Sequence, residues 1–412
     1  MTPTKRRSFK KSENDFSDNG ILVKDAMKLL ERSEFYDEII QTFNLDEIQA
    51  DFIEIKGAKK LVDTLIDADE EFDKIDLDSS LENVRLHKYT DDNQIILEIS
   101  DIQENSILTK TKKDIIYPQS IYSVRSEYLG MYGIDKYLEH CKAHGYYDII
   151  DANIEMLNTR VDQSQKNKKF RLLRKKGEYY IRAITSTDVY KDYSLRFSLF
   201  VALIELHKLT KYKGHSFYVE EFNLSASDLT VLFKSSKKER VSKDTEIGFA
   251  FELVNDEIKR DAVKLNGLFS VYMGGEEIFV KSEEPKKHNI ISFPHSVSLD
   301  KVKDIITSLN SRIDDFISET TNDAKKIKVL GAPDLFRDYM LMKVQNSKKL
   351  EFNKNYREEI KKILSRKVQT IFELATLFKK VEMLIEDEHI VSLDFWRHKL
   401  YQVLMDGVKN HS

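Results

Sequence analysis

One stretch of the chain constrains the fold more than any other. Residues 195–209 place apolar side chains on nearly every face of a helix, and Asp192 or Ser194 could cap its first turn. A helix that is apolar all round is normally buried, so other elements must surround it. Strand-like runs follow it at residues 217–222, 229–234, 246–254, 265–273, 277–281 and 290–293. We therefore predict an α+β fold in which an antiparallel sheet forms a core around a buried helix.

Two hairpins are predicted upstream of this helix. The first joins residues 84–89 to residues 95–99 across a polar turn. The second joins residues 170–173 to residues 179–185 across a basic turn that contains Gly177. Both would add strands to the antiparallel part of the fold.

The last third of the chain changes to helical spacing. Apolar stripes run over residues 302–317, 360–385 and 395–404. The first of them begins shortly after Ser298, a candidate N-cap. We predict a helical C-terminal region over residues 298–412, whose helices either pack on the core or build a homo-oligomer.

Composition divides the rest of the chain into three regions. Residues 1–20 are basic and polar and are expected to form a disordered tail. Residues 21–110 form an acidic and partly helical region, in which residues 67–78 are expected to be a solvated connection. The α+β core domain is assigned to residues 111–297.

Composition also excludes several classes of protein. The longest apolar run, at residues 199–204, is far shorter than the roughly 20 residues that a bilayer crossing needs. A single cysteine, Cys141, excludes an internal disulfide framework and fits a reducing compartment. The basic start lacks the apolar run of a signal peptide. The sequence therefore indicates a soluble, cytoplasmic protein with no membrane partner.

The formal net charge of -4 conceals a strong segregation of charge along the chain. Residues 34–105 contain 21 acidic and 6 basic residues, a net charge of -15. Residues 160–213 contain 14 basic and 5 acidic residues, a net charge of +9. A basic region of this size can attract a polyanion, but it can equally dock on the acidic region of the same chain.

The common catalytic and cofactor signatures are missing. There is no G-x-x-x-x-G-K-[ST] loop, and no G-x-G-x-x-G between a strand and a helix. His140, Cys141 and His144 offer three potential metal ligands within five residues, but a structural zinc site needs four ligands. His288 and His295 could take part in acid-base or metal chemistry only if the fold brought them to one place. We assign no catalytic residue, cofactor or metal, and we favour a protein that is not an enzyme.

The basic hairpin is the strongest candidate for a binding site. Lysine and arginine can neutralise phosphates, and aromatic rings beside them can stack on unpaired bases, which suits single strands. The alternative is a solvated sheet edge, because Lys and Arg also protect edges from aggregation. The predicted nucleic-acid-binding residues are Lys166, Lys168, Lys169, Phe170, Arg171, Arg174, Lys175, Lys176, Tyr179, Arg182, Lys191 and Arg196.

Two blocks of sequence resemble a known family. The hairpin over residues 170–186, Tyr190 and the apolar helix form the first block, and residues 247–257 with residues 265–268 form the second. Over about residues 165–295 the chain resembles the family called domain of unknown function 932, which occurs in phage- and plasmid-borne proteins. The resemblance implies a mobile-element protein, in the cytoplasm of a bacterial host if a phage encodes it. It implies no known reaction and no catalytic residue.

Three hypotheses about function follow. The first is a phage or mobile-element protein that binds single-stranded DNA or RNA without strong sequence preference and anneals strands in replication or recombination. The second is a non-enzymatic host-takeover, counter-defence or virion protein, whose acidic residues 34–105 contact a host or phage protein. The third is a metal-dependent nuclease with carboxylates scattered along the chain.

Overall fold

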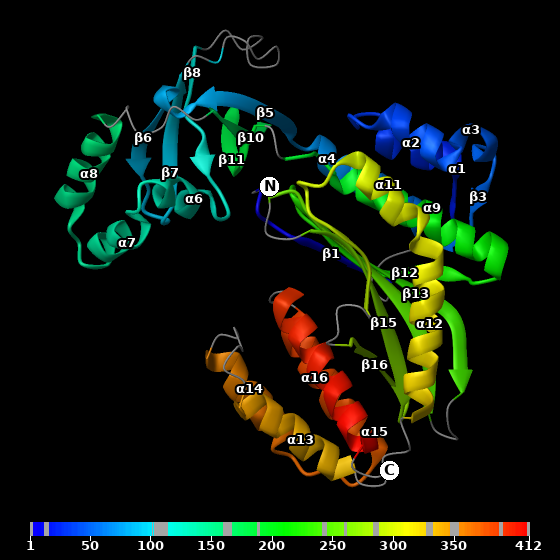
Figure 1. The fold of residues 1–412 in the computed structure, drawn as a ribbon. Coiled ribbons are helices and arrows are strands. Elements are labelled where there is room, and N and C mark those ends of the chain that lie inside the picture. Colours follow the sequence, from blue (N-terminus) through cyan, green and yellow to red (C-terminus); the bar gives the residue numbers. More distant parts are fainter. Residues whose placement is uncertain are drawn as a thin grey trace.

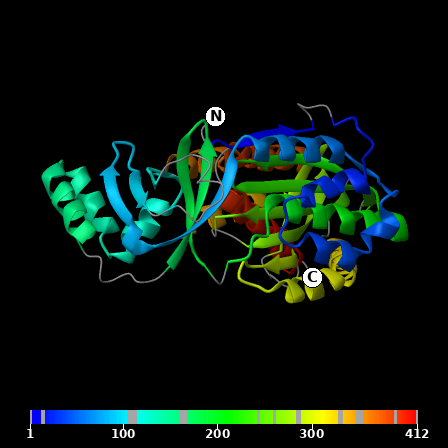
Figure 2. The ribbon, with the colours of Figure 1, turned by 90° about the horizontal axis from the view of Figure 1, so that it is seen from above.

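The protein is built on two curved β-sheets with helices on their faces, and the sheets lie side by side in an elongated molecule (Figures 1 and 2). This computed structural model describes residues 3–11, 16–100, 102, 114–159, 167–187, 190–240, 245–258, 262–282, 288–326, 333–346, 354–386 and 390–409. We call the two sheets the large sheet and the small sheet. The predicted α+β class is confirmed.

The large sheet has the strand order β1-β12-β13-β14-β15-β16, with β17 beside β15 and β4 beside β12. The pairings are antiparallel except for that of β4 with β12, and they confirm the six strands predicted after the apolar helix. The strands are β1 (Arg7–Lys10), β4 (Ile55–Lys56), β12 (Phe217–Leu224), β13 (Asp228–Arg240), β14 (Thr245–Asp256), β15 (Val263–Met273), β16 (Glu276–Val280) and β17 (Asn289–Phe293).

Helix α9 (Leu195–Lys213) is the buried helix that the sequence predicts. The Ser194 hydroxyl accepts a hydrogen bond from the backbone N–H of Phe197 (3.1 Å), so Ser194 is the N-cap. Gly214 ends the helix with a φ of 66°. The helix shares one core with the inner face of the large sheet and with short N-terminal elements: α1 (Val23–Ala26), η1 (Met27–Leu30), α2 (Tyr36–Phe43), α3 (Leu45–Ile48), α4 (Ala58–Glu70), and the strand pair β2 (Ile21–Leu22) and β3 (Phe52–Ile53).

The small sheet has the order β5-β10-β11-β9-β7-β6, with β8 beside β7, and it contains both predicted hairpins. Its own apolar core lies under three helices at the end of the molecule away from the large sheet (Figure 1). The elements are β5 (Asp73–Ser80), η2 (Leu81–Asn83), β6 (Val84–Tyr89), β7 (Ile95–Ser100), β8 (Ile115–Ile116), β9 (Gln119–Ser120), α6 (Val124–Met131), α7 (Asp135–Ala143), α8 (Tyr147–Thr159), β10 (Asn167–Lys175) and β11 (Glu178–Ser186).

The C-terminal region is helical, as predicted. Trp396 is fully buried in it, and its ring meets the ring of Phe378 edge to face at 5.9 Å between centroids. The apolar stripe over residues 360–385 is divided between two helices rather than one. The helices are α11 (Leu299–Thr307), α12 (Leu309–Lys326), α13 (Pro333–Asn346), α14 (Lys354–Leu364), α15 (Ile371–Glu386) and α16 (Ile390–Lys409).

The structure corrects the predicted domain boundaries. Residues 21–110 do not form a separate acidic region, because their helices join the core of the large sheet and β5, β6 and β7 belong to the small sheet. The stretch 67–78 is the end of α4 and most of β5, not a solvated connection. Within the predicted tail, Arg7–Lys10 is strand β1, paired with β12. Composition missed β1 and β5 because strands far along the chain supply their hydrogen bonds.

No described helix combines the length and the apolar character that crossing a membrane requires.

Close packing of α12 on the large sheet generates a testable prediction. A Cβ atom at Gly267 would lie 2.5 Å from the Phe316 ring, so Gly267→Ala should destabilise the protein by about 1–3 kcal/mol through overpacking. Phe316→Leu should recover part of this loss in the alanine background. Urea unfolding measures both effects. Gly130→Ala in α6 is the control, because nothing lies within 4 Å of that position. A Gly267→Ala protein as stable as the wild type would contradict the packing.

Candidate nucleic-acid interface

The basic hairpin forms as predicted, but it is not at a sheet edge. Lys176 and Gly177 both have positive φ, 50° and 84°, as a two-residue type I′ turn requires. Strand β10 is paired with β5 on its other side, and β11 is paired with β9. The hairpin therefore lies in the middle of the small sheet, and the alternative interpretation as a solvated edge is wrong.

Acidic residues of β5, together with Glu71 just before it, pair with four of the hairpin's cations. Strand β5 runs antiparallel to β10, so side chains of opposite charge face each other across the strand pair. Beyond the paired strands, Lys175 binds Glu71 at 3.2 Å. The cross-strand pairs are Arg174 with Asp73 (2.8 Å), Arg171 with Asp76 (3.1 Å) and Lys169 with Asp78 (3.6 Å). The acidic and basic regions of the sequence thus meet each other inside one sheet.

A buried carboxylate, Glu257, lies where the two sheets meet. It follows β14 of the large sheet and is fully buried. Its side chain accepts hydrogen bonds from Arg182 of β11, from Lys74 of β5 (3.0 Å) and from the backbone N–H of Leu195 (2.9 Å). One carboxylate therefore links the large sheet, the small sheet and the first turn of α9. We call Glu257, Lys74, Arg182 and Arg171 the junction cluster.

Arg171 connects the junction cluster to the segment before α9. Its guanidinium donates to the carbonyl oxygen of Glu257 (2.9 Å) and to the carboxylate of Asp192 (2.8 Å). It also lies over the Tyr190 ring, 4.4 Å from the centroid, and that ring stacks on His295 at 4.9 Å. Nearby, Arg196 of α9 forms an ion pair with Asp69 (2.7 Å). These arginines hold internal positions.

Electrostatics within the junction cluster favour the charged state of every member whose pKa is shifted. Burial alone raises the pKa of Glu257, but Lys74, Arg182 and Arg171 together hold that pKa far below its usual value. Burial lowers the pKa of Lys74, but Asp69 and Glu257 outweigh it and the net pKa is raised. Burial likewise opposes the charge of Arg171, while Asp192 raises its pKa. The cluster is thus a set of fixed charges that compensate one another.

Most of the predicted binding residues are committed to the interior or to ion pairs. Phe170, Arg171, Tyr179, Arg182 and Arg196 are buried. Three more residues are half-buried and form the ion pairs with acidic residues described above: Lys169, Arg174 and Lys175. Lys176 and Lys191 are exposed and Lys168 is half-buried, while Lys166 lies outside the described residues. Among the described residues of the predicted set, Lys168, Lys176 and Lys191 are the cations that form no ion pair.

A second group of cations and rings lies on the outer face of the large sheet. Tyr218 and Tyr272 alternate with side chains that enter the core, so both point away from α9. The ammonium of Lys11 lies 3.9 Å from the Tyr218 ring centroid, and that of Lys238 lies 3.4 Å from the Tyr272 centroid. Lys234 lies between the two rings, at 5.8 Å and 5.4 Å. We call these five residues the lysine-tyrosine ladder.

The members of the ladder differ in exposure and in charge balance. Lys11 and Lys238 are exposed, both tyrosines are half-buried, and Lys234 is buried beside Glu277. Burial opposes the charge of Lys234, but its hydrogen bonds to Glu277 and Tyr272 raise its pKa. Burial raises the pKa of Tyr272, so its ring stays neutral at physiological pH. The ladder presents two neutral rings with an exposed lysine over each of them.

Sequence reasoning missed the ladder because its members come from three separate strands and from the residue after β1. Tyr218 lies directly opposite Lys234 in the register of β12 and β13. Alternation along each strand could have placed these side chains on the polar face, but only the pairing register brings them together.

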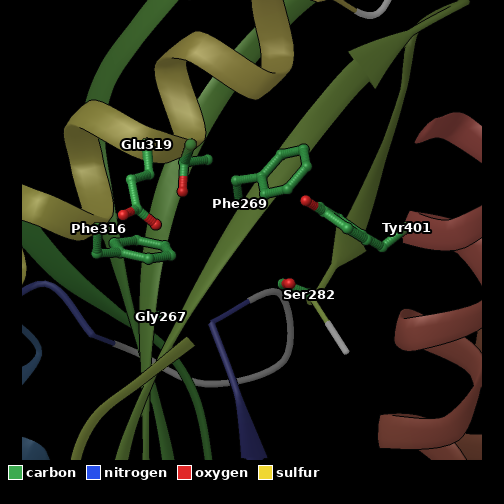
Figure 3. Close-up of a pocket in the computed structure, with 7 residues that line it drawn as sticks. Gly267, Phe269, Ser282, Phe316, Glu319 and Tyr401 are labelled. Atoms are coloured by element: carbon green, nitrogen blue, oxygen red, sulfur yellow. The ribbon is translucent and has the colours of Figure 1, made fainter. Parts of the chain in front are cut away.

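A shallow pocket lies between β15, α12 and α16 (Figure 3). It encloses about 270 Å³, part of which is open solvent, whereas small-molecule sites span roughly 300–1,000 Å³. Its lining mixes rings with few polar groups: Gly267, Phe269, Ser282, Phe316, Glu319, Thr320 and Tyr401. This pocket gives no reason to add a cofactor.

The histidines named in the sequence do not form a metal centre in the described part of the chain. Cys141 is buried, whereas His140 and His144 are exposed and their rings lie 4.1 Å apart, tilted by 37°. His295 bonds to Asn255 and to the carbonyl oxygen of Lys191, and burial lowers its pKa. His288 lies instead beside the ring of His398 (5.4 Å). Among the described residues, no three His, Cys, Asp or Glu side chains converge as metal ligands.

Comparison of the chain with protein-family models, with curated proteins and with solved structures found no match. The resemblance to the domain of unknown function 932 therefore stays a prediction.

The junction cluster predicts a large loss of stability on removal of its central charge. Glu257→Gln leaves the buried Arg182 without its counter-charge and leaves Lys74 with Asp69 alone, which should lower the free energy of unfolding by about 3–5 kcal/mol. Urea unfolding at pH 7 measures the change. Asp78→Asn is the control, because that ion pair is exposed and should contribute less than about 1 kcal/mol. Equal effects of the two substitutions would show that Glu257 is not central.

The same cluster predicts a pH dependence. Because the folded state lowers the pKa of Glu257 below its ordinary value of 4.5, its stabilisation is fully present above that pH and is lost as the pH falls below it. The difference in unfolding free energy between wild type and Glu257→Gln should therefore be constant from pH 7 to pH 5 and shrink towards pH 3. A difference that grows on acidification would contradict the lowered pKa.

Proposed function

We propose that the protein binds single-stranded nucleic acid without strong sequence preference and that contact is made through the lysine-tyrosine ladder. The observation that carries this proposal is the alternation of cations and rings across one face of the large sheet. Lysines can neutralise the phosphates of a strand, and each tyrosine can stack on one base. Stacking and charge do not distinguish one base from another, so sequence preference should be weak.

The position of the ladder supports this role. The tyrosines stand on paired strands, so the sheet fixes their spacing before any ligand arrives. The exposed cations Lys11 and Lys238 cover the ring faces, and an ammonium on a flexible stem can move to a phosphate while a base takes its place. Lys234 stays paired with Glu277 and fixes the rings rather than the strand. Each member of the ladder thus has one task in binding.

The basic hairpin has a smaller part in this proposal than in the sequence-based prediction. Four of its cations already pair with carboxylates of β5 or with Glu71, and a phosphate would have to compete with these partners of the same chain. Lys168, Lys176 and Lys191 remain available at its periphery. The resemblance implies a mobile-element protein, and our proposal includes strand annealing within a phage or plasmid element as the use of this binding.

Matched substitutions test which surface binds. Tyr218→Leu with Tyr272→Leu should weaken binding of a labelled 30-nucleotide strand, because each stacked base contributes about 1–3 kcal/mol. Lys11→Ala with Lys238→Ala should reduce the slope of log K against log salt by about 0.7 for each lost phosphate contact. Fluorescence anisotropy over a salt series measures both.

The control removes the same number of charges from the hairpin. Lys176→Ala with Lys191→Ala should change the affinity for the strand less than twofold, because the ladder is intact in this variant. Salt screens the exposed charges that these two substitutions remove. A larger loss from this pair than from the ladder pair would assign binding to the hairpin. Absence of binding to wild type at about 50 mM salt would reject the proposal. Degradation of the strand that needs Mg²⁺ would indicate a nuclease instead.

A further inference from the structure

Helices α7 and α8 form the end of the small-sheet lobe that lies away from the large sheet (Figures 1 and 2). Large apolar side chains are exposed here at high density. Tyr147 is 58% exposed, and five such residues fall within the 26 residues from Met131 to Met156, out of 13 in the described part of the chain. The five are Met131 at the end of α6, Tyr137 on α7, Tyr146 directly before α8, and Tyr147 and Met156 on α8. Exposed apolar groups gathered in this way mark an interaction surface.

Aromatic rings continue along the outer side of α7 in a short stack. The His140 and His144 rings lie 4.1 Å apart, and the His144 ring stacks on Tyr146 at 5.7 Å with an angle of 24°. Tyr137 lies one turn earlier on the same helix and is 48% exposed. A different side of α7 packs on the protein, because Leu138 and Cys141 are buried in the core of the small sheet. The ring row therefore has no role in that core.

The exposed side of α8 adds charge of one sign to this face. Asp148, Asp151 and Glu155 follow helical spacing, are exposed, and form no ion pair with a described lysine or arginine. Tyr147 borders this stripe on one side and Met156 on the other. The side of α8 that carries Ile150 and Leu157 is buried in the core of the small sheet, and Asn158 near the end of the helix exchanges hydrogen bonds with the backbone of Leu86 on β6 (2.9 and 3.0 Å). The helix is thus fixed in place with its acidic and aromatic side outward.

We propose that this α7–α8 face docks an arginine-rich segment of a partner protein. Guanidinium groups stack on tyrosine rings and bind a carboxylate through two parallel hydrogen bonds. This face offers tyrosine rings and carboxylates within one helix hairpin. The apolar side chain of Met156 would contact the aliphatic parts of the same segment. The acidic stripe repels nucleic acid, so this surface acts independently of the lysine-tyrosine ladder.

A designed peptide pair tests the proposal with the full-length protein. The probe is a fluorescein-labelled 20-residue helical peptide with Arg at i, i+3 and i+7 on a Leu/Ala background, and the second peptide has Glu at the same positions. The arginine peptide should bind the wild type at low salt, and the glutamate peptide should not. Asp148→Asn/Asp151→Asn/Glu155→Gln should weaken binding by about tenfold, the combined effect of three surface ion pairs.

Two further variants separate charge from stacking and fold. Tyr147→Ala/Met156→Ala should weaken binding by a similar factor with an unchanged salt dependence. Asp37→Asn/Glu38→Gln/Glu47→Gln removes three exposed carboxylates of α2 and α3 and should leave the affinity unchanged. Circular dichroism melting confirms that each variant is folded. Equal losses in the two triple variants, or no binding to the wild type, would overturn the proposal. The proposal would also be overturned if the wild type failed to bind the peptide and formed a dimer that the Tyr147→Ala/Met156→Ala substitutions dissociate. The occupant of this face would then be a second copy of the chain.

Discussion

The arrangement of the whole molecule depends on one buried carboxylate. Glu257 receives Arg182 and Lys74 from the small sheet and the first N–H of α9, and it is itself the continuation of a large-sheet strand. A buried ion of this kind is tolerated only when its partners are fixed, since an unpaired charge in the interior costs several kcal/mol. The two sheets and α9 must therefore hold one relative position. The surfaces available for binding follow from that position.

The pairing of charges also explains why regional net charge is a poor guide to partners in this protein. The acidic residues of β5 and the basic residues of β10 are far apart in the sequence but adjacent in the small sheet. Each neutralises the other, so neither the -15 of residues 34–105 nor the +9 of residues 160–213 describes a free surface. What remains for partners is smaller and local: rings with lysines on the large sheet, and rings with carboxylates on α7 and α8.

Much of the fold could be predicted where a local pattern carries the signal. The buried helix α9, its Ser194 cap, the strands of the large sheet and the turn at Gly177 all follow from periodicity and turn chemistry. Strand β1 and the role of β5 could not be predicted, because each is held by hydrogen bonds to a strand more than 80 residues away. The prediction of the binding residues on the hairpin failed for the same reason, because their contacts are long-range. Arg171 and Arg182 were correctly placed on a hairpin, but only burial shows that they bind Asp192 and Glu257 instead of solvent or phosphate.

The sequence by itself determined the elements and the inventory of charges: an apolar helix that must be buried, strands that must pair, and opposite charges in two blocks. The tertiary structure alone decided which charges meet. The pairing of β5 with β10 and the ion pairs to Glu257 join residues that are far apart in the sequence. No local pattern specifies these partners, because register and burial depend on the whole sheet. The same long-range register brought Lys11, Tyr218, Lys234, Tyr272 and Lys238 onto one face.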